Sequence, residues 1–317
     1  MLDVKVTRKT YETDDIVSLE LMKPDGSSLP SFTAGAHIDL HLPDNMIRQY
    51  SLFNSSTETD RYMIGVLKDP SSRGGSLAVH DHIKEGDIVQ ISEPRNLFAL
   101  EQGARRSILF AGGIGVTPIL AMAEQLVRTN AEFEMHYCAR SKQRMAFMEH
   151  IANSAFASNV QCHFDDGDEA QRLNIDQVLA TPEPGTHIYV CGPTGFMDYV
   201  LTAAETLGWS AAQIHREYFS AAPVDHSQDG AFEVEINSTG QVFVIPADQS
   251  VLSVLEEAGV DIPMACEEGV CGTCLTRVLE GEPEHRDVFM SDEEHALNNQ
   301  FTPCCSRARS ARLLLDL

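Results

Sequence analysis

Five cysteines near the C-terminus constrain this chain more than any other feature. Three stand in the segment CEEGVCGTC with the spacing C-x4-C-x2-C, and an adjacent pair follows 30 and 31 residues later: Cys266, Cys271, Cys274, Cys304 and Cys305. Plant-type [2Fe–2S] sites have this spacing, with three thiolates on one loop and a fourth from elsewhere. Gly269 and Gly272 give the loop the freedom to adopt positive φ and to bring amides toward the sulfides. Zinc frameworks instead pair two short CxxC or CxxH units, so the pattern favours an iron–sulfur cluster.

Length and composition predict a protein of two or three domains without a membrane span. The chain has 317 residues, 43% of them hydrophobic, and no apolar run of about 20 residues. Residues 1–6 alternate like a strand and lack the apolar core of a signal peptide. The cysteines outside the cluster pattern, Cys138, Cys162 and Cys191, are expected to be reduced thiols, which indicates a cytoplasmic protein.

The net charge of −24 argues against nucleic acid as a partner. A phosphate-binding surface needs clustered Lys and Arg. Residues 231–317 carry 5 Lys or Arg against 16 Asp or Glu. This excess of acids can serve solubility alone or can steer a basic partner, and the sequence leaves both open.

Residues 1–102 are expected to form an antiparallel β-barrel that binds flavin. Apolar and polar residues alternate with period two in short segments between turns, at 18–21, 38–42 and 62–66. In the tetrapeptide RQYS, alternation puts Arg48 and Tyr50 on one face, where a cation and a ring can reach one ligand. The turn at 72–76, before a possible helix at 77–82, offers two glycines and backbone amides to a phosphate. Each motif alone can be an ordinary strand or turn, but together they favour a flavin phosphate site.

Residues 103–222 are expected to form an α/β domain with a parallel sheet. Strands at 107–111, 133–138 and 187–191 alternate with helical segments, the first at 119–128 with Pro118 near its first turn. The turn GGIGVTP between the first strand and helix lacks the third spaced glycine of a dinucleotide fingerprint. No acid ends the next strand, which leads into Arg140 instead. The turn can still bring amides close to a pyrophosphate.

A second candidate nucleotide loop, CGPTG, begins at Cys191 directly after a strand. A lone cysteine is more often a small buried hydrophobe. Its position at the carboxyl end of a parallel strand, before a glycine turn, favours a functional role.

Residues 223–231 are small and polar and predict a linker, after which residues 232–317 form the third domain. Alternation at 232–237 and 241–245 predicts a β-hairpin. A helix is expected at 250–259, with Ser250 as N-cap and Gly259 as its stop. The cluster loop follows.

In this order, RQYS, SRGGS, GGIGVTP, CGPTG, HREYF, CEEGVCGTC and CCSRAR resemble the phthalate dioxygenase reductase family over essentially the whole chain. The resemblance implies a flavin barrel, a ferredoxin-reductase-like nicotinamide domain and a C-terminal plant-type ferredoxin domain with a β-grasp, α+β fold. It also implies FMN, with FAD as the alternative, a [2Fe–2S] cluster, and NADH rather than NADPH as the donor. Electrons would pass from NADH through the flavin and the cluster to a Rieske-type oxygenase that acts on an aromatic ring or as an O-demethylase.

The resemblance carries over to individual residues. The flavin would be held by Arg48, Tyr50, Ser51, Gly65, Val66, Leu67, Arg73, Gly74, Gly75 and Ser76. The nucleotide would lie along Gly113, Gly115, Val116, Thr117, Pro118, Arg140, Cys191, Gly192 and Pro193. Cys191 and Phe219, the latter packing on the flavin ring, are the candidate catalytic residues. The cluster ligands would be Cys266, Cys271, Cys274 and Cys304, because the family's C-x-S-R-A pattern matches Cys304 and leaves Cys305 as a neighbour. Consecutive side chains in extended backbone point oppositely, so both are not expected to ligate.

Two other functions remain to be weighed. A general electron carrier or redox sensor without a dedicated oxygenase would need no nucleotide loops. An oxygenase acting on its own substrate is disfavoured because the sequence suggests no 2-His-1-carboxylate set.

Overall fold

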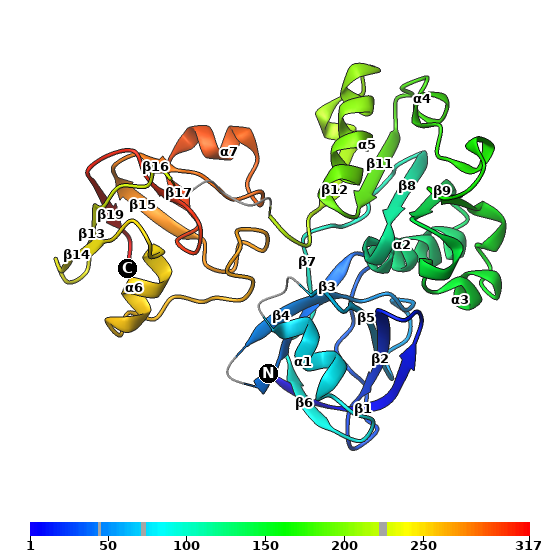
Figure 1. Cartoon of the computed structure of the whole chain (residues 1–317), viewed down its shortest axis with the longest axis horizontal. Helices are drawn as coiled ribbons and strands as arrows, with labels where there is room; N and C mark the ends of the chain where they lie inside the picture. The colour runs from blue at the N-terminus through cyan, green and yellow to red at the C-terminus, as the bar shows by residue number, and fades with distance from the viewer. Residues whose placement is uncertain (44–45, 71–73, 222–226) are drawn as a thin grey trace. The chain divides into compact units, whose positions relative to one another are not determined.

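The computed structural model describes residues 1–43, 46–70, 74–221 and 227–317. The chain divides into two compact units, Met1–Phe219 and Ser220–Leu317 (Figure 1). The first unit contains an antiparallel barrel and a parallel α/β sheet, and the second contains a mixed sheet with one packed helix. No described helix is long and apolar enough to cross a bilayer.

The barrel of the first unit is a seven-stranded antiparallel sheet in the order β4-β3-β6-β1-β2-β5, with β7 paired to β3. Its strands are β1 (Leu2–Tyr11), β2 (Ile16–Met22), β3 (Ala36–His41), β4 (Ile47–Ser51), β5 (Tyr62–Leu67), β6 (Ile88–Ile91) and β7 (Arg95–Asn96). The two end strands meet just beyond β4, where Leu52 bridges Ile64 and the Phe53 N–H donates to the Met63 carbonyl at 3.0 Å. Alternate apolar side chains of these strands fill the interior together with helix α1 (Gly75–Asp81).

The α/β part has a parallel sheet in the order β10-β9-β8-β11-β12. Its strands are β8 (Arg106–Gly112), β9 (Glu132–Ala139), β10 (Val160–Phe164), β11 (Thr186–Cys191) and β12 (Ile214–Glu217). Successive side chains of β8 point to opposite faces of the sheet and so belong to two different hydrophobic cores. Leu109 and Ala111 belong to the core that includes helix α2 (Val116–Arg128), whereas Ile108 and Phe110 belong to the core that includes α5 (Thr194–Thr206). The two helices therefore cover opposite faces of the sheet, as a buried parallel sheet requires.

Short helices complete the first unit around this sheet. The α-helical ones are α3 (Met148–Ala152) and α4 (Ile175–Val178), and the 3-10 turns are η2 (Gly113–Gly115), η3 (Lys142–Arg144), η4 (Ala157–Asn159), η5 (Glu169–Gln171) and η6 (Ala211–Gln213).

The second unit is a five-stranded mixed sheet in the order β14-β13-β19-β15-β17, with a separate β16-β18 pair. Its elements are β13 (Phe232–Ile236), β14 (Val242–Ile245), α6 (Val251–Glu257), β15 (Thr276–Glu280), β16 (Pro283–Glu284), α7 (Asp292–Leu297), β17 (Gln300–Phe301), β18 (Arg307–Ala308) and β19 (Arg312–Leu315). Helix α6 buries Val251, Leu252 and Leu255 in the core of this sheet. Strand β14 lies at the edge, with Val242 and Val244 exposed.

The predicted fold class is confirmed in all three parts, with small differences at element ends. The first crossover helix begins at Val116 rather than 119, because Pro118 fits the first turn of a helix, where its missing N–H has no partner to lose. Ser250 caps α6 by accepting the Ser253 N–H at 3.0 Å, as expected.

Candidate functional site

Four buried thiols meet in the second unit. Cys266, Cys271 and Cys274 come from the loop before β15, and Cys304 comes from the turn after β17. The Cys266 sulfur is hydrogen-bonded with Cys271 and Cys304, and the Cys304 sulfur also with Cys274. Backbone N–H groups reach the same sulfurs, from Glu268 to Cys266 and from Thr273 to Cys271, each at 3.4 Å. The set has the donors and the amide contacts that an iron–sulfur cluster uses.

The thiols shift one another's proton affinity. Hydrogen bonds from Cys271 and Cys304 lower the pKa of Cys266. The same bonds raise the pKa of Cys271 and of Cys304, which keep their protons. A buried set of thiols that already concentrates negative charge on a sulfur suits iron, because iron binds thiolates.

Cys305 lies in a different environment from Cys304. Its sulfur lies 3.3 Å from the Thr302 hydroxyl and 3.9 Å from the Ser306 hydroxyl. Hydrogen bonds from Cys304 first, and then from Thr302 and Ser306, lower the pKa of Cys305. The two neighbouring cysteines therefore have different partners.

Two glycines of the cluster loop adopt a backbone conformation with positive φ and lie where a side chain would collide with its neighbours. Gly269 and Gly272 have φ of 73° and 67°, so the expected positive φ is present at both. A Cβ on Gly269 would lie 2.5 Å from the Cys305 sulfur, and one on Gly272 would lie 2.4 Å from the Phe289 ring. No other residue fits at either position without moving its neighbours.

In the first unit the RQYS strand and the glycine turn do come together. The Arg48 side chain lies against Gly75, where an added Cβ would be 2.5 Å from Arg48 Cγ. Gly74 has φ of 89° directly before α1, and the Ser76 hydroxyl accepts the Asp69 N–H at 3.2 Å. The Arg48 side chain and the start of α1 thus lie next to each other, and this arrangement can bind a phosphate group. Arg73 lies outside the described residues.

Tyr50 and Ser51 follow Arg48 on β4. Burial raises the pKa of Tyr50, so its phenol stays neutral. The Ser51 hydroxyl donates to Glu217 Oε2 at 3.4 Å across the boundary between barrel and parallel sheet. Glu217 is at the end of β12, opposite Cys191 in the register of β11 and β12. Its burial raises its pKa to about 8.

The strand carrying Gly65, Val66 and Leu67 approaches the parallel sheet closely at Gly65. A Cβ there would lie 2.8 Å from both Thr117 and Phe147. Gly65 thus brings the barrel against the first turn of α2, which carries the predicted nucleotide residues Val116, Thr117 and Pro118.

The two predicted nucleotide loops meet at the carboxyl edge of the parallel sheet. A Cβ on Gly115 would lie 2.4 Å from the Cys191 carbonyl oxygen, and one on Gly192 would lie 2.9 Å from Gly112 Cα. Pro193 follows as N-cap of α5, while Gly113 has φ of 52° in η2. Cys191 is fully buried, which raises the pKa of its thiol well above the usual range. Ligands of open α/β sheets bind at such an edge.

The remaining predicted residues lie near this edge. Arg140 is exposed and directly follows β9. Phe219 is 39% exposed and lies two residues beyond β12.

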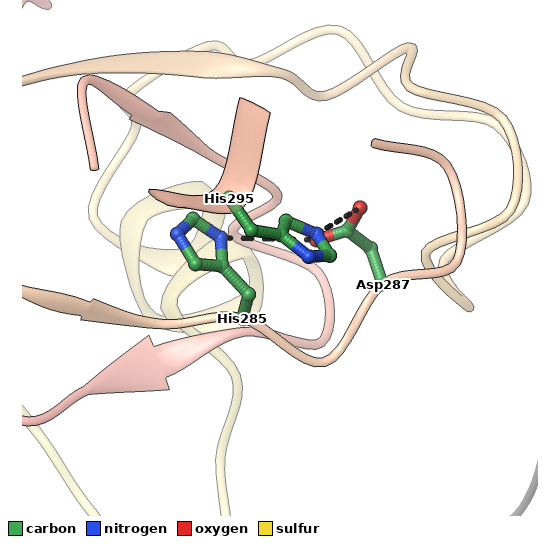
Figure 2. Close-up of side chains that lie close together, drawn as sticks. All are labelled: His285, Asp287 and His295. Carbon is green, nitrogen blue, oxygen red and sulfur yellow. Dashed lines mark hydrogen bonds and ion pairs between the residues drawn. The ribbon is translucent and has the colours of Figure 1, made fainter. Parts of the chain in front are cut away.

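Two features were not predicted from the sequence. Glu217 was part of the quoted HREYF motif, but its contact with Ser51 depends on the pairing of two distant segments. The expectation that the chain has no 2-His-1-carboxylate set was wrong. His285, Asp287 and His295 place their ligand atoms within 4.8 Å of one another (Figure 2). The irregular spacing of these residues hid the group, because their contact requires the folding of α7.

Two family models match the chain. Residues 234–309 match the 2Fe-2S iron-sulfur cluster binding domain. Residues 92–214 match the N-terminal domain of the dimethylamine monooxygenase subunit DmmA-like proteins.

Full-length relatives are similar over the whole chain. The vanillate O-demethylase oxidoreductase of a Pseudomonas species is 56% identical over 317 residues, with 100% of both chains covered. That of Pseudomonas putida is 58% identical, again with 100% of both covered. The likeness to vanillate O-demethylase reductases, indicated by stretches such as RQYSLFN and FTPCCSRAR, is therefore confirmed.

A solved structure agrees. Phthalate dioxygenase reductase, described as a modular structure for electron transfer from pyridine nucleotides to [2Fe-2S], is 39% identical. It covers 100% of this chain and 98% of its own, with a TM-score of 0.78. The chain is thus an oxidoreductase with a [2Fe–2S] domain, and it belongs to the phthalate dioxygenase reductase family of oxygenase reductase components.

Proposed function

We propose that this chain takes electrons from NADH through FMN and a [2Fe–2S] cluster and delivers them to a Rieske-type oxygenase or O-demethylase. The observation that carries the proposal is the buried set of four thiols in the second unit of a chain whose first unit joins a barrel to two nucleotide-type loops. A flavin bound in these sites would supply the conversion between a two-electron hydride donor and a cluster that carries one electron at a time.

The chain's residues position and shield these groups. Arg48 and the turn at Gly74, Gly75 and Ser76 would hold the flavin phosphate, and Arg73 belongs to the same proposed set. Tyr50, Ser51 and the strand Gly65, Val66 and Leu67 would line the flavin, and Phe219 would cover its ring.

The nucleotide would lie across the loops that meet at Gly115 and Cys191. Gly113, Val116, Thr117, Pro118, Gly192 and Pro193 complete this proposed set, with Arg140 near the ribose. Cys191, buried as a neutral thiol, would pack beside the nicotinamide, since a neutral group there does not oppose hydride transfer. Glu217 would hold a proton beside Ser51, because its pKa is raised to about 8 by burial.

The cluster ligands are proposed to be Cys266, Cys271, Cys274 and Cys304. Cys304 is favoured over Cys305 because its sulfur bonds with Cys266 and Cys274, while Cys305 faces the Thr302 hydroxyl. We also propose the domain bounds 1–102, 103–222 and 232–317, with a linker at 223–231 and a cytoplasmic location.

A Rieske-type partner is proposed from the relatives' activities. The relatives include a vanillate O-demethylase oxidoreductase and a phthalate dioxygenase reductase, which are named for oxygenase systems. The acidic surface of residues 231–317 would attract a basic face of that partner.

The variant Cys271→Ser tests the order of transfer. It should lose the cluster's visible absorbance and cytochrome c reduction, while NADH still bleaches the flavin at the wild-type rate. Cys162→Ser, which changes a half-buried cysteine of the first unit, is the control and should keep both steps. Loss of flavin reduction in Cys271→Ser alone would refute separate sites for the two cofactors.

The cofactor choices have their own tests. Acid release and chromatography of the bound flavin should yield FMN, and recovery of FAD would overturn that choice alone. Steady-state kinetics should favour NADH over NADPH. A preference for NADPH would instead assign Arg140 to a 2′-phosphate.

A further inference from the structure

Three metal-ligating side chains that are not part of the set of four thiols converge in the second unit. His285 follows β16, Asp287 lies two residues later, and His295 projects from α7 (Figure 2). His295 Nε2 is 3.2 Å from Asp287 Oδ2, and His285 Nδ1 is 4.0 Å from Asp287 Oδ1. The two rings stack with centroids 4.4 Å apart. The contacting atoms come from two segments that α7 brings together.

His285 is oriented so that one nitrogen is left for a ligand. Its Nε2 lies 3.1 Å from the Asn298 side-chain oxygen, so Nε2–H donates there and Nδ1 carries the lone pair. Nδ1 is buried and has no hydrogen-bond partner among the residues that the structure describes. The side chain is 10% exposed, and burial lowers the pKa of His285, which keeps it neutral near pH 7. A histidine that binds a metal usually donates from its other ring nitrogen to an oxygen, and the Asn298 oxygen fills that role for His285.

Asp287 is fixed independently of the histidines. Its side chain is fully buried, Oδ2 accepts the Met290 N–H at 2.9 Å, and Oδ1 accepts the Thr302 hydroxyl at 3.3 Å. A buried carboxylate is costly unless it is paired, and His285 beside it is neutral. A bound cation would supply the missing positive charge.

We propose that His285, Asp287 and His295 form a second metal site, for Zn²⁺, with two imidazole nitrogens, one carboxylate oxygen and a water as ligands. Zn–N and Zn–O distances near 2.0–2.1 Å put tetrahedral ligands about 3.4 Å apart. The 3.2 Å and 4.0 Å separations run to different oxygens of Asp287, and the three ligand atoms lie within 4.8 Å of one another. Closure around one metal therefore requires the stacked histidine rings to rotate as well as to move, because a metal lies in the plane of each imidazole that binds it. The acids Asp292, Glu293 and Glu294 in the first turn of α7 add a field that attracts a cation.

The site lies one contact from the cluster loop. The Val288 N–H donates to the Gly269 carbonyl at 3.1 Å, and Thr302, which donates to Asp287, also contacts the Cys305 sulfur at 3.3 Å. A cation at Asp287 therefore adds positive charge close to the four thiols. The reduction potential of a cluster follows the net charge around it, so zinc binding should raise that potential.

The test uses the full chain with its iron retained. The protein is freed of loose metal by chelating resin, incubated with Zn²⁺, desalted, and analysed for iron and zinc in one sample. We expect one zinc per chain in addition to the cluster iron, and a more positive cluster potential in a redox titration.

Three variants distinguish zinc bound at this site from zinc bound elsewhere on the protein. His295→Gln should lose the bound zinc and the potential shift while keeping its iron. Asn298→Gly, which removes the acceptor for His285 but suits the positive φ of 51° there, should weaken zinc affinity about 10–100-fold. His187→Ala alters another stacked histidine pair, His187 and His215, and should bind zinc as wild type does.

Each remaining outcome overturns the proposal. No zinc retained by the wild type means that Asp287 and His295 only anchor α7. Equal retention by His295→Gln places the zinc elsewhere. Zinc that rises as iron falls has entered the four thiols instead.

Discussion

Glu217 is a carboxylic acid that the fold keeps protonated near neutral pH. Nothing in its immediate sequence marks it, because its burial depends on β12 pairing with β11 and on Ser51 reaching it from β4. Desolvation disfavours the charged form and raises its pKa to about 8, and the hydrogen bond from Ser51 opposes that shift only in part.

The raised pKa makes stability depend on pH. Because the folded value, about 8, lies above the ordinary 4.5, the folded chain holds an extra proton between those values. The free energy of unfolding should therefore fall as pH rises from 4.5 to 8, by at most roughly 1.4 kcal/mol per pH unit. Glu217→Gln removes this loss of stability. The difference between its unfolding midpoint and that of the wild type should therefore shift in favour of the variant between pH 6 and pH 9.

Thermal unfolding of the first unit, followed by flavin fluorescence at both pH values, measures this. The control is Glu205→Gln, the same chemical change at an exposed site, which should track the wild type. Parallel curves for Glu217→Gln and wild type would show that Glu217 is ionised throughout.

The neighbours Cys304 and Cys305 should respond oppositely to the same change. Cys304→Ala removes a sulfur that bonds with Cys266 and Cys274, so iron content should fall and the visible absorbance should bleach. Cys305→Ala removes a thiol held by hydroxyls and should keep two irons per chain. Iron analysis and absorbance spectra of the two proteins decide it, and a reversed pattern would make Cys305 the fourth ligand.

At the scale of elements, the cluster loop depends on a glycine for two separate reasons. Gly269 has φ of 73°, and its Cα approaches Cys305 and Asp287 so closely that a Cβ would lie 2.5 Å and 2.9 Å from their atoms. Gly259, beyond the end of α6, has φ of 81° but nothing within 4 Å.

Comparing Gly259→Ala with Gly269→Ala separates the cost of the left-handed backbone conformation from the cost of a steric collision. Gly259→Ala should cost only the left-handed penalty of about 1–2 kcal/mol and should keep the cluster. Gly269→Ala adds the collision, so it should also lower iron content well below that of Gly259→Ala. Iron analysis with thermal unfolding tests this, and equal effects at both sites would mean that the loop shifts to accept a methyl group.

The elements were largely predictable, and the contacts between them were not. Period-two alternation gave the barrel strands and the 232–245 hairpin, because those patterns are local. The Cys-rich loop was recognisable because its ligands lie close together in the sequence. Phe147, by contrast, is a buried residue with φ of 62° packed against Gly65, and no local signal marks it. The contacts of Ser51 with Glu217 and of His285 with His295 likewise arise only from tertiary packing.

At the scale of the molecule, the start of the second unit is anchored by an ion pair. Asp229 is 1% exposed and contacts Arg286 at 2.5 Å and Arg307 at 3.6 Å. Arg307 also donates to the carbonyl of Gly230 at 3.0 Å. Residues 229 and 230, within the predicted linker, are thus attached to the β16-β18 region of the unit that carries the cluster.

Removing the Asp229 carboxylate should destabilise the second unit strongly, although only one small side chain is lost. Asp229→Ala takes a buried partner from two arginines, which typically costs about 3–5 kcal/mol. Loss of cluster absorbance on heating should occur at a lower temperature than in the wild type. Asp248→Ala, at an exposed acid in the same unit, is the control and should melt like the wild type. An unchanged midpoint in Asp229→Ala would mean that solvent replaces the pair at no cost.

Strand β14, at the edge of the sheet in the second unit, affects how the protein aggregates during storage. Strand β14 offers unpaired backbone groups and two exposed valines, Val242 and Val244, the latter 62% exposed. The run from 242 to 245 is uncharged and rich in β-formers, the composition of segments that template intermolecular sheets, and Pro246 directly after it limits its extension. We expect oxidative loss of iron to destabilise the unit that holds this strand in place. Bleaching and turbidity should therefore develop together in storage, and Val244→Lys should slow the turbidity without slowing the bleaching.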